Sequence, residues 1–170
     1  DIAGEGSKAA QICLNYFKTL DKSKLKEREY WELFCKYVKD VDADVSKYVY
    51  KNRAEFINLF GAAAVEKKLF QLFSNGAYRY WKKEGDSGIF DEKGFENYVH
   101  QLMKKDLKGK EQIIMDARMA YAMNTGDWAK YVQMGTDRLN DGEKSDFVVY
   151  NWALRVNMQC NDTKLREKAA

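Results

Sequence analysis

Apolar residues recur along this chain with the spacing of an α-helix, not with the alternation of a β-strand. Residues 7–20 place apolar side chains at positions i, i+1, i+4, i+5 and i+8, and residues 30–38 repeat that spacing. This spacing gathers the side chains on one broad face of each helix. The polar segment 21–27 connects them, which predicts an antiparallel hairpin with aromatic side chains buried between its two helices.

The same period predicts helices along most of the remaining chain. Asp44 is a candidate cap for a short helix, a second short helix ends at Gly61, and a longer one covers residues 62–83 with Trp81 extending its apolar face. Further helices are expected near residues 95–103, 113–121, 128–139, 147–160 and from 163 onward. Proline, which breaks helix interiors, is absent. We therefore predict an all-α fold, an array of antiparallel helical hairpins.

The segment KEGDSGIFDEKG, residues 83–94, carries the strongest loop signal, with three glycines and several acidic residues. A calcium-binding EF-hand needs oxygen ligands at its first, third and fifth positions. Counting from Asp86 puts Gly88 third and Phe90 fifth, and neither supplies a side-chain oxygen. We expect a surface loop.

Two bends divide the C-terminal helices at a regular interval. Gly126 and Asp127 lie 35 residues before Asn161 and Asp162. Gly or Asn suits a left-handed helix exit, and Asp can cap the helix that follows. We interpret Gly126-Asp127-Trp128 as a structural bend between two helices, because no glycine-rich cradle and no adjacent base accompanies it.

A period of this length with helix–turn–helix content resembles the tetratricopeptide (TPR) family over residues 109–170. Thr163 and Lys164 stand where the first unit has Trp128 and Ala129, no proline closes either unit, and the last helix is short. At the 35-residue offset, Asp116 and Ala120 correspond to Asn151 and Arg155. In such arrays one helical face forms a groove. The candidate partner-binding residues are Asp116, Asn151 and Arg155.

A second resemblance covers more of the chain. The stretch YWELFCKYVKDVDADVSKYVYKNRAEFINLFGAAAVEKKL, followed by YAMNTGDWAKYV and NWALRVNMQCND, resembles the helical region after the thioredoxin domain in thioredoxin-family proteins of Bacteroidetes. The resemblance implies that this chain is a fragment of a longer protein located in the periplasm or cell envelope. The thiol–disulfide chemistry would lie in a C-x-x-C motif that this chain lacks.

Composition and charge exclude or disfavour several classes of function. The 29 basic and 26 acidic residues leave a net charge of +3, and the two signs are interspersed, which disfavours nucleic-acid binding. No apolar run approaches the ~18 residues of a membrane span. Cys13, Cys35 and Cys160 stand far apart, so no redox pair or zinc motif is formed locally. We expect buried thiols, although two of them can still meet in space.

Catalytic chemistry finds little support in the residue pattern. His100 is the only histidine, and no Ser or Cys is placed beside it by sequence. Acidic pairs such as Asp91-Glu92 lie next to turns, where capping and solvation explain them. We expect no catalytic residue, no metal and no cofactor.

We predict one helical domain, with irregular hairpins over residues 1–108. It acts as a non-catalytic interaction module for a protein or polypeptide, and it packs on its own thioredoxin-like domain. Two alternatives stay open, a helical enzyme that uses His100 with acidic residues and a structural spacer.

Overall fold

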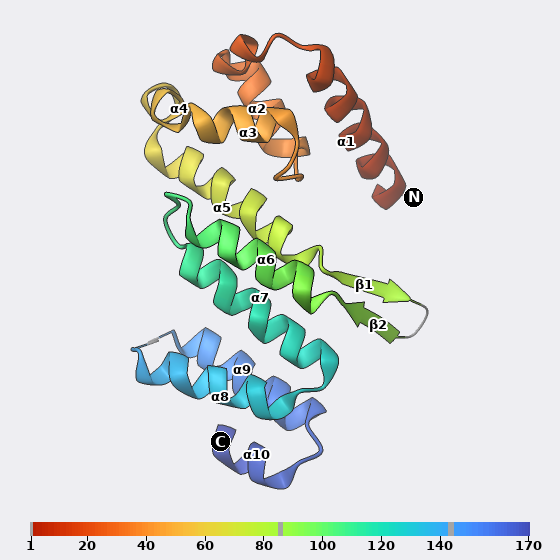
Figure 1. Ribbon diagram of the computed structural model, residues 1–170, viewed down its shortest axis with the longest axis vertical. Helices are drawn as coiled ribbons and strands as arrows, with labels where there is room; N and C mark the ends of the chain where they lie inside the picture. Colours follow the sequence, from red (N-terminus) through yellow and green to blue (C-terminus); the bar gives the residue numbers. More distant parts are fainter. Residues whose placement is uncertain (1, 85–86, 143–144) are drawn as a thin grey trace. The chain divides into compact units, whose positions relative to one another are not determined.

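The computed structural model describes residues 2–84, 87–142 and 145–170, and these residues are mostly helical (Figure 1). The helices are α1 (Ile2–Thr19), α2 (Arg28–Tyr37), α3 (Asp44–Lys51), α4 (Arg53–Phe60), α5 (Ala62–Tyr78), α6 (Glu92–Met103), α7 (Lys110–Thr125), α8 (Trp128–Asn140), α9 (Asp146–Gln159) and α10 (Thr163–Ala169). They form two compact units. The first contains residues up to 79 and 101–110, and the second contains residues 80–100 and 111–170.

An aromatic core holds the first unit together. Trp31 of α2 stacks on Phe60 of α4 with ring centroids 4.8 Å apart, and Phe17 of α1 meets Phe34 of α2 edge-on at 6.5 Å. The α1–α2 pairing thus uses the aromatic faces that the spacing predicts. Only part of the apolar face of α1 is covered, because Ile12 is 61% exposed.

Two local predictions in this unit need correction. Residues 21–27 are not a plain polar link: Lys22–Lys26 forms a 3₁₀ helix (η1) whose Leu25 is fully buried. Asp44 is not the cap of α3, because Ala43 occupies that position and Asp44 lies in the first turn. A carboxylate in the first turn still interacts favourably with the helix dipole.

Lys68 is a buried lysine that completes the end of α2. Its Nζ donates hydrogen bonds to the main-chain oxygens of Cys35 at 2.8 Å and Val38 at 2.5 Å. These carbonyls lie at the C-terminal end of α2, where helices leave oxygens unpaired. Burial lowers the pKa of Lys68, so these two hydrogen bonds offset part of the cost of placing an ammonium group in the core.

A β-hairpin corrects the all-α prediction. The expected helix 62–83 ends at Tyr78, and Trp81 begins a strand, β1 (Trp81–Glu84), instead of extending the apolar face of that helix. This strand pairs antiparallel with β2 (Ser87–Phe90), which lies within the expected surface loop. Asp86, the starting point of the EF-hand comparison, lies outside the described residues. Phe90 of β2 stacks on Tyr121 of α7 at 4.1 Å, so burial of an aromatic ring against α7 holds β2 in place.

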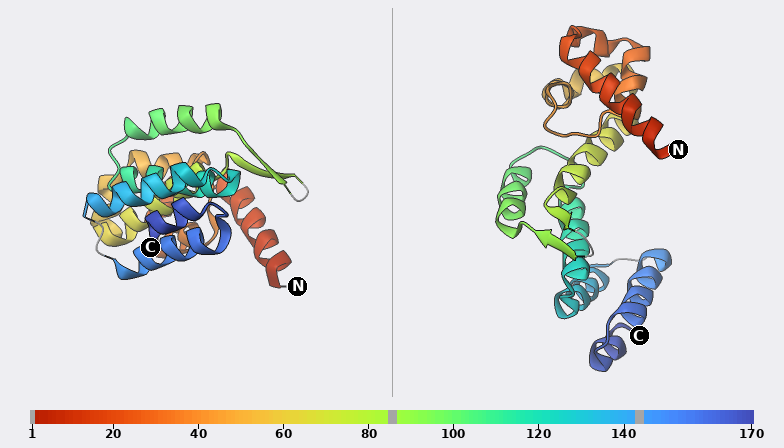
Figure 2. Two further views of the ribbon diagram at one scale, coloured as in Figure 1. Left: turned by 90° about the horizontal axis from the view of Figure 1, so that it is seen from below. Right: turned by 90° about the vertical axis from the view of Figure 1, so that its right-hand side faces the viewer.

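The helices α8, α9 and α10 lie side by side in the second unit (Figures 1 and 2). Trp152 of α9 occupies the space beside Gly135 of α8, and a Cβ built on Gly135 would lie 2.1 Å from atoms of the indole. Val132 and Val156 are fully buried in the same cluster. The close approach of α8 and α9 therefore depends on the absence of a side chain at position 135.

Gly135→Ala should lower the free energy of unfolding by about 2 kcal/mol, because overpacking outweighs the ~1 kcal/mol gain in helix propensity. Urea denaturation would measure this change in the free energy of unfolding. In the Trp152→Leu background the same substitution should cost far less, since the smaller side chain leaves room. An equal cost in both backgrounds would show that the indole is not the obstacle.

Candidate binding site

The bend after α7 is built from one glycine and one carboxylate. Gly126 has φ 74°, in the left-handed region that favours glycine. The N–H of Asp127 donates to the oxygen of Ala122 at 2.8 Å, and its Oδ1 accepts from the N–H of Lys130 at 3.0 Å. These contacts end α7 and cap α8, as the interpretation of a structural bend requires.

The bend after α9 works differently. Asp162 caps α10 by accepting from the N–H groups of Lys164 at 2.9 Å and Leu165 at 3.3 Å. Asn161, however, does not take the expected left-handed conformation, because no described residue other than glycine has a positive φ. Cys160 leaves α9 in an extended conformation, and the Arg166 side chain donates to its oxygen. The carbonyl of the residue that ends α9 therefore pairs with an arginine side chain.

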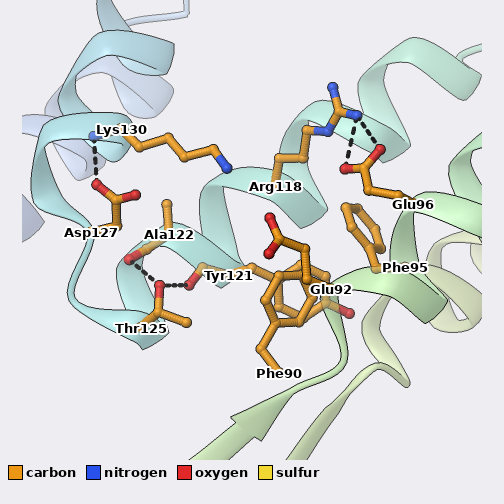
Figure 3. A pocket seen from close by; sticks show the side chains of 10 residues that line it. All are labelled: Phe90, Glu92, Phe95, Glu96, Arg118, Tyr121, Ala122, Thr125, Asp127 and Lys130. Carbon is orange, nitrogen blue, oxygen red and sulfur yellow. Dashed lines mark hydrogen bonds and ion pairs between the residues drawn. The ribbon is translucent and has the colours of Figure 1, made fainter.

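A pocket of about 190 Å³ lies beside the first bend, between β2 and helices α6, α7 and α8 (Figure 3). Its apolar wall contains Phe90, Phe95 and Tyr121. The ring of Tyr121 stacks on Phe90 at 4.1 Å and meets Phe95 edge-on at 4.8 Å. Phe95 and Tyr121 are buried in the core, whereas the half-buried Phe90 presents part of its ring to the pocket.

Charged side chains of both signs surround the opening of this pocket. One guanidinium nitrogen of Arg118 donates to both oxygens of Glu96, at 2.9 and 3.1 Å. Glu92 and Lys130 extend toward the centre of the pocket (Figure 3) and have no hydrogen bond or ion pair from their side chains to any described residue. Asp91, by contrast, accepts from the N–H of Gly94 at 2.9 Å, so capping fits the first member of the Asp91-Glu92 pair and solvent exposure fits the second.

The structure places the three predicted partner-binding residues outside this pocket. Asp116 accepts from Arg138 of α8 at 3.0 Å, which connects α7 to α8. Asn151 donates to the oxygen of Phe147 at 2.7 Å, and Arg155 of α9 reaches the sulfur of Met123 at 3.4 Å. Asp116 therefore has a structural partner within the unit, whereas Arg155 stays exposed on α9.

Helix α9 has a second apolar face that the sequence analysis did not separate from the first. Phe147 is 77% exposed, Tyr150 65%, Leu154 38% and Met158 73%. Their spacing of three, four and four residues puts them along one side of the helix. Trp152 and Val156 occupy the opposite side, in the core. We call these four exposed residues the α9 stripe.

The enzyme alternative depends on His100 together with acidic residues. His100 is exposed on α6 and does not line the pocket. Trp128 meets Tyr131 edge-on at 5.7 Å and packs against the helical core, away from the pocket. Within the described ranges, no three His, Cys, Asp or Glu side chains lie close enough together to hold a metal ion.

The three cysteines are free thiols, with Cys13 and Cys160 buried and Cys35 half-buried. Burial raises the pKa of Cys13, and it raises the pKa of Cys35 to about 11, although the nearby Lys68 ammonium acts in the opposite direction. A thiol is nucleophilic as its thiolate. Cys35 therefore stays protonated and unreactive near neutral pH.

Comparison with known proteins identifies no relative: no family model, curated protein or solved structure matches this chain. Among the helices of the described residues, none combines the length and apolar character that crossing a bilayer requires. Function must therefore be argued from the residues themselves.

Gly126→Ala should lower the free energy of unfolding by about 1 kcal/mol through backbone strain. A Cβ at this position meets no atom within 4 Å, so no clash contributes. Asn161→Ala, at the corresponding place in the second bend, should change stability by less than about 0.5 kcal/mol. Chemical denaturation of both variants checks the contrast, which equal losses would contradict.

Cys35 should make the protein less stable at alkaline pH. Its usual pKa of 9.0 applies to the unfolded chain and about 11 to the folded one, so between these values the unfolded state loses the proton first and gains stability. Since the thiol is partly exposed, the loss should be about 1 kcal/mol. Urea titrations from about pH 8 to about pH 11 should show this loss of stability in the wild type.

Cys35→Ala is the matched variant for this measurement. Any packing cost of the substitution is the same at every pH, so only the slope reports the thiol. A Cys35→Ala protein whose stability falls as steeply as that of the wild type would rule out the assignment.

Proposed function

We propose that the chain is a non-catalytic helical interaction module that binds a polypeptide through the α9 stripe. The observation that carries this proposal is the exposure of four large apolar side chains in a row on a helix whose other face is already packed. Contiguous exposed apolar side chains are typical of interaction surfaces, whereas single ones are ordinary. A spacer would need no such row.

The geometry of the stripe supports a helical or extended apolar segment as the partner. Its residues have the three- and four-residue spacing with which one helix presents anchors to another. Asn151 follows Phe147 by one turn, and Arg155 precedes Met158 by three residues, so the two polar side chains border the stripe. Two of the three predicted partner residues thus retain a role, as a polar edge that orients the bound segment.

A TPR-like arrangement of the C-terminal helices is part of this proposal. Its support is the 35-residue interval between the capping carboxylates of Asp127 and Asp162 and the contact of Arg155 on α9 with Met123 on α7. In such arrays, corresponding helices line a common surface. The accessory role beside a thioredoxin-like domain has its support in the sequence resemblance, and we propose it on that basis.

The α9 stripe can be tested with a displayed library of random peptides selected on the wild-type chain. For the selected peptides, Phe147→Ser/Met158→Ser should weaken binding at least tenfold, because two exposed anchors are removed while the core face of α9 is unchanged. Calorimetry gives the affinities, and circular dichroism checks that the variant remains folded.

Leu59→Ser is the control, since Leu59 is a similarly exposed apolar residue in the first unit, at 51%. Its binding should equal that of the wild type. A library that yields no binder, or peptides whose binding survives the double substitution, would refute the stripe as the interaction surface.

A further inference from the structure

The pocket beside the first bend has two charged side chains that form no hydrogen bond or ion pair within the described residues. Arg118 and Glu96 pair with each other, and the carboxylate of Asp127 caps α8. Glu92 and Lys130 remain, one acidic and one basic, exposed to solvent and without a side-chain partner among the described residues. Figure 3 shows both extending into the same space.

Their places in the helices do not account for this arrangement. Glu92 is the first residue of α6, where a carboxylate interacts favourably with the helix dipole, but that interaction does not require it to line a pocket. Lys130 lies in the first turn of α8, where the same dipole disfavours a positive charge. Lys130 thus places a positive charge on one side of the pocket, and Glu92 places an unpaired negative charge on the other. A ligand that carries both charges can pair with both side chains.

The size and wall of the pocket restrict that ligand. A volume of about 190 Å³ is below the ~300 Å³ at which ordinary small-molecule and cofactor sites begin. The half-buried ring of Phe90 supplies an apolar surface within it. A compact ligand with a small apolar part therefore fits better than an extended one.

We propose that this pocket binds a small zwitterion, in which an ammonium group pairs with Glu92, a carboxylate pairs with Lys130, and a short apolar part lies against Phe90. Two sources offer this chemistry: a free α-amino acid, and neighbouring basic and acidic side chains of a polypeptide. Both charges, which are exposed to solvent in the free chain, would then be paired by charge-assisted hydrogen bonds at the two ends of the ligand.

Heteronuclear NMR titration of the whole chain tests the site with defined probes. Free leucine represents the first source, and an end-blocked Lys-Ala-Glu peptide the second. Leucine amide lacks the carboxylate and N-acetyl-leucine lacks the ammonium. At least one zwitterionic probe should shift the amide signals around Phe90, Tyr121 and Lys130, and for the leucine arm each singly charged analogue should bind about tenfold more weakly.

Substitutions then assign the two charges. Glu92→Gln and Lys130→Gln should each weaken binding about tenfold, whereas Lys93→Gln, on the same helix but outside the pocket, should have no effect. The exchange Glu92→Lys/Lys130→Glu should restore part of the affinity, because a zwitterion can bind in the reversed orientation.

Two results would overturn the proposal: no shift near the pocket with either zwitterion at millimolar concentration, or equal binding by the Gln variants and the wild type. The Phe147→Ser/Met158→Ser variant should bind the zwitterion normally, so failure of this pocket and failure of the α9 stripe are separate outcomes.

Discussion

The second unit depends on the contact between Trp152 and Gly135. The indole lies where any side chain at position 135 would be, and this close approach determines which side of α9 faces α8. The ring is held by packing alone, because its buried Nε1 finds no hydrogen-bond acceptor in the described part of the chain. Since α9 is apolar on both sides, burying Trp152 and Val156 necessarily turns Phe147, Tyr150, Leu154 and Met158 outward.

The same unit contains both proposed binding features, and their chemistry differs. The α9 stripe is apolar with a polar edge, which suits a polypeptide segment. The pocket beside Gly126-Asp127 combines an aromatic wall with one free charge of each sign, which suits a small zwitterion. In the first unit the buried charged group, Lys68, instead donates hydrogen bonds to carbonyls at the end of α2. Buried charge there supports the fold, whereas the exposed charges of Glu92 and Lys130 in the second unit form the proposed ligand site.

Local periodicity was sufficient to predict the helices but not the sites. The helix ends at Gly61 and the bend at Gly126 could be predicted because glycine and a following cap leave a local signal. The hairpin was missed although the sequence places Gly-Asp, a dipeptide typical of hairpins, between residues 81–84 and 87–90. Phe90 also needs Tyr121, 31 residues away, to be buried.

The pocket and the stripe were missed for different reasons. Glu92 and Lys130 lie on different helices, far apart in the sequence, so only the folded chain brings them to one opening. The stripe was visible as excess apolar content in residues 147–160, but a helix that is apolar all round gives no period from which to choose its buried side. The contact of Trp152 with Gly135 decides which side of α9 is buried. Because this contact joins two helices, local sequence does not reveal it.

The rate of maleimide labelling along α9 tests the central claim, that one face of this helix is packed and the other is free. In a Met158→Cys variant, peptide mass spectrometry would compare the new thiol with Cys160, which is natural to the chain and 1% exposed. Position 158 should label at the rate of an exposed thiol while Cys160 stays protected. Protection of position 158 as strong as that of Cys160 would mean that the chain covers the stripe itself, and the account would be wrong.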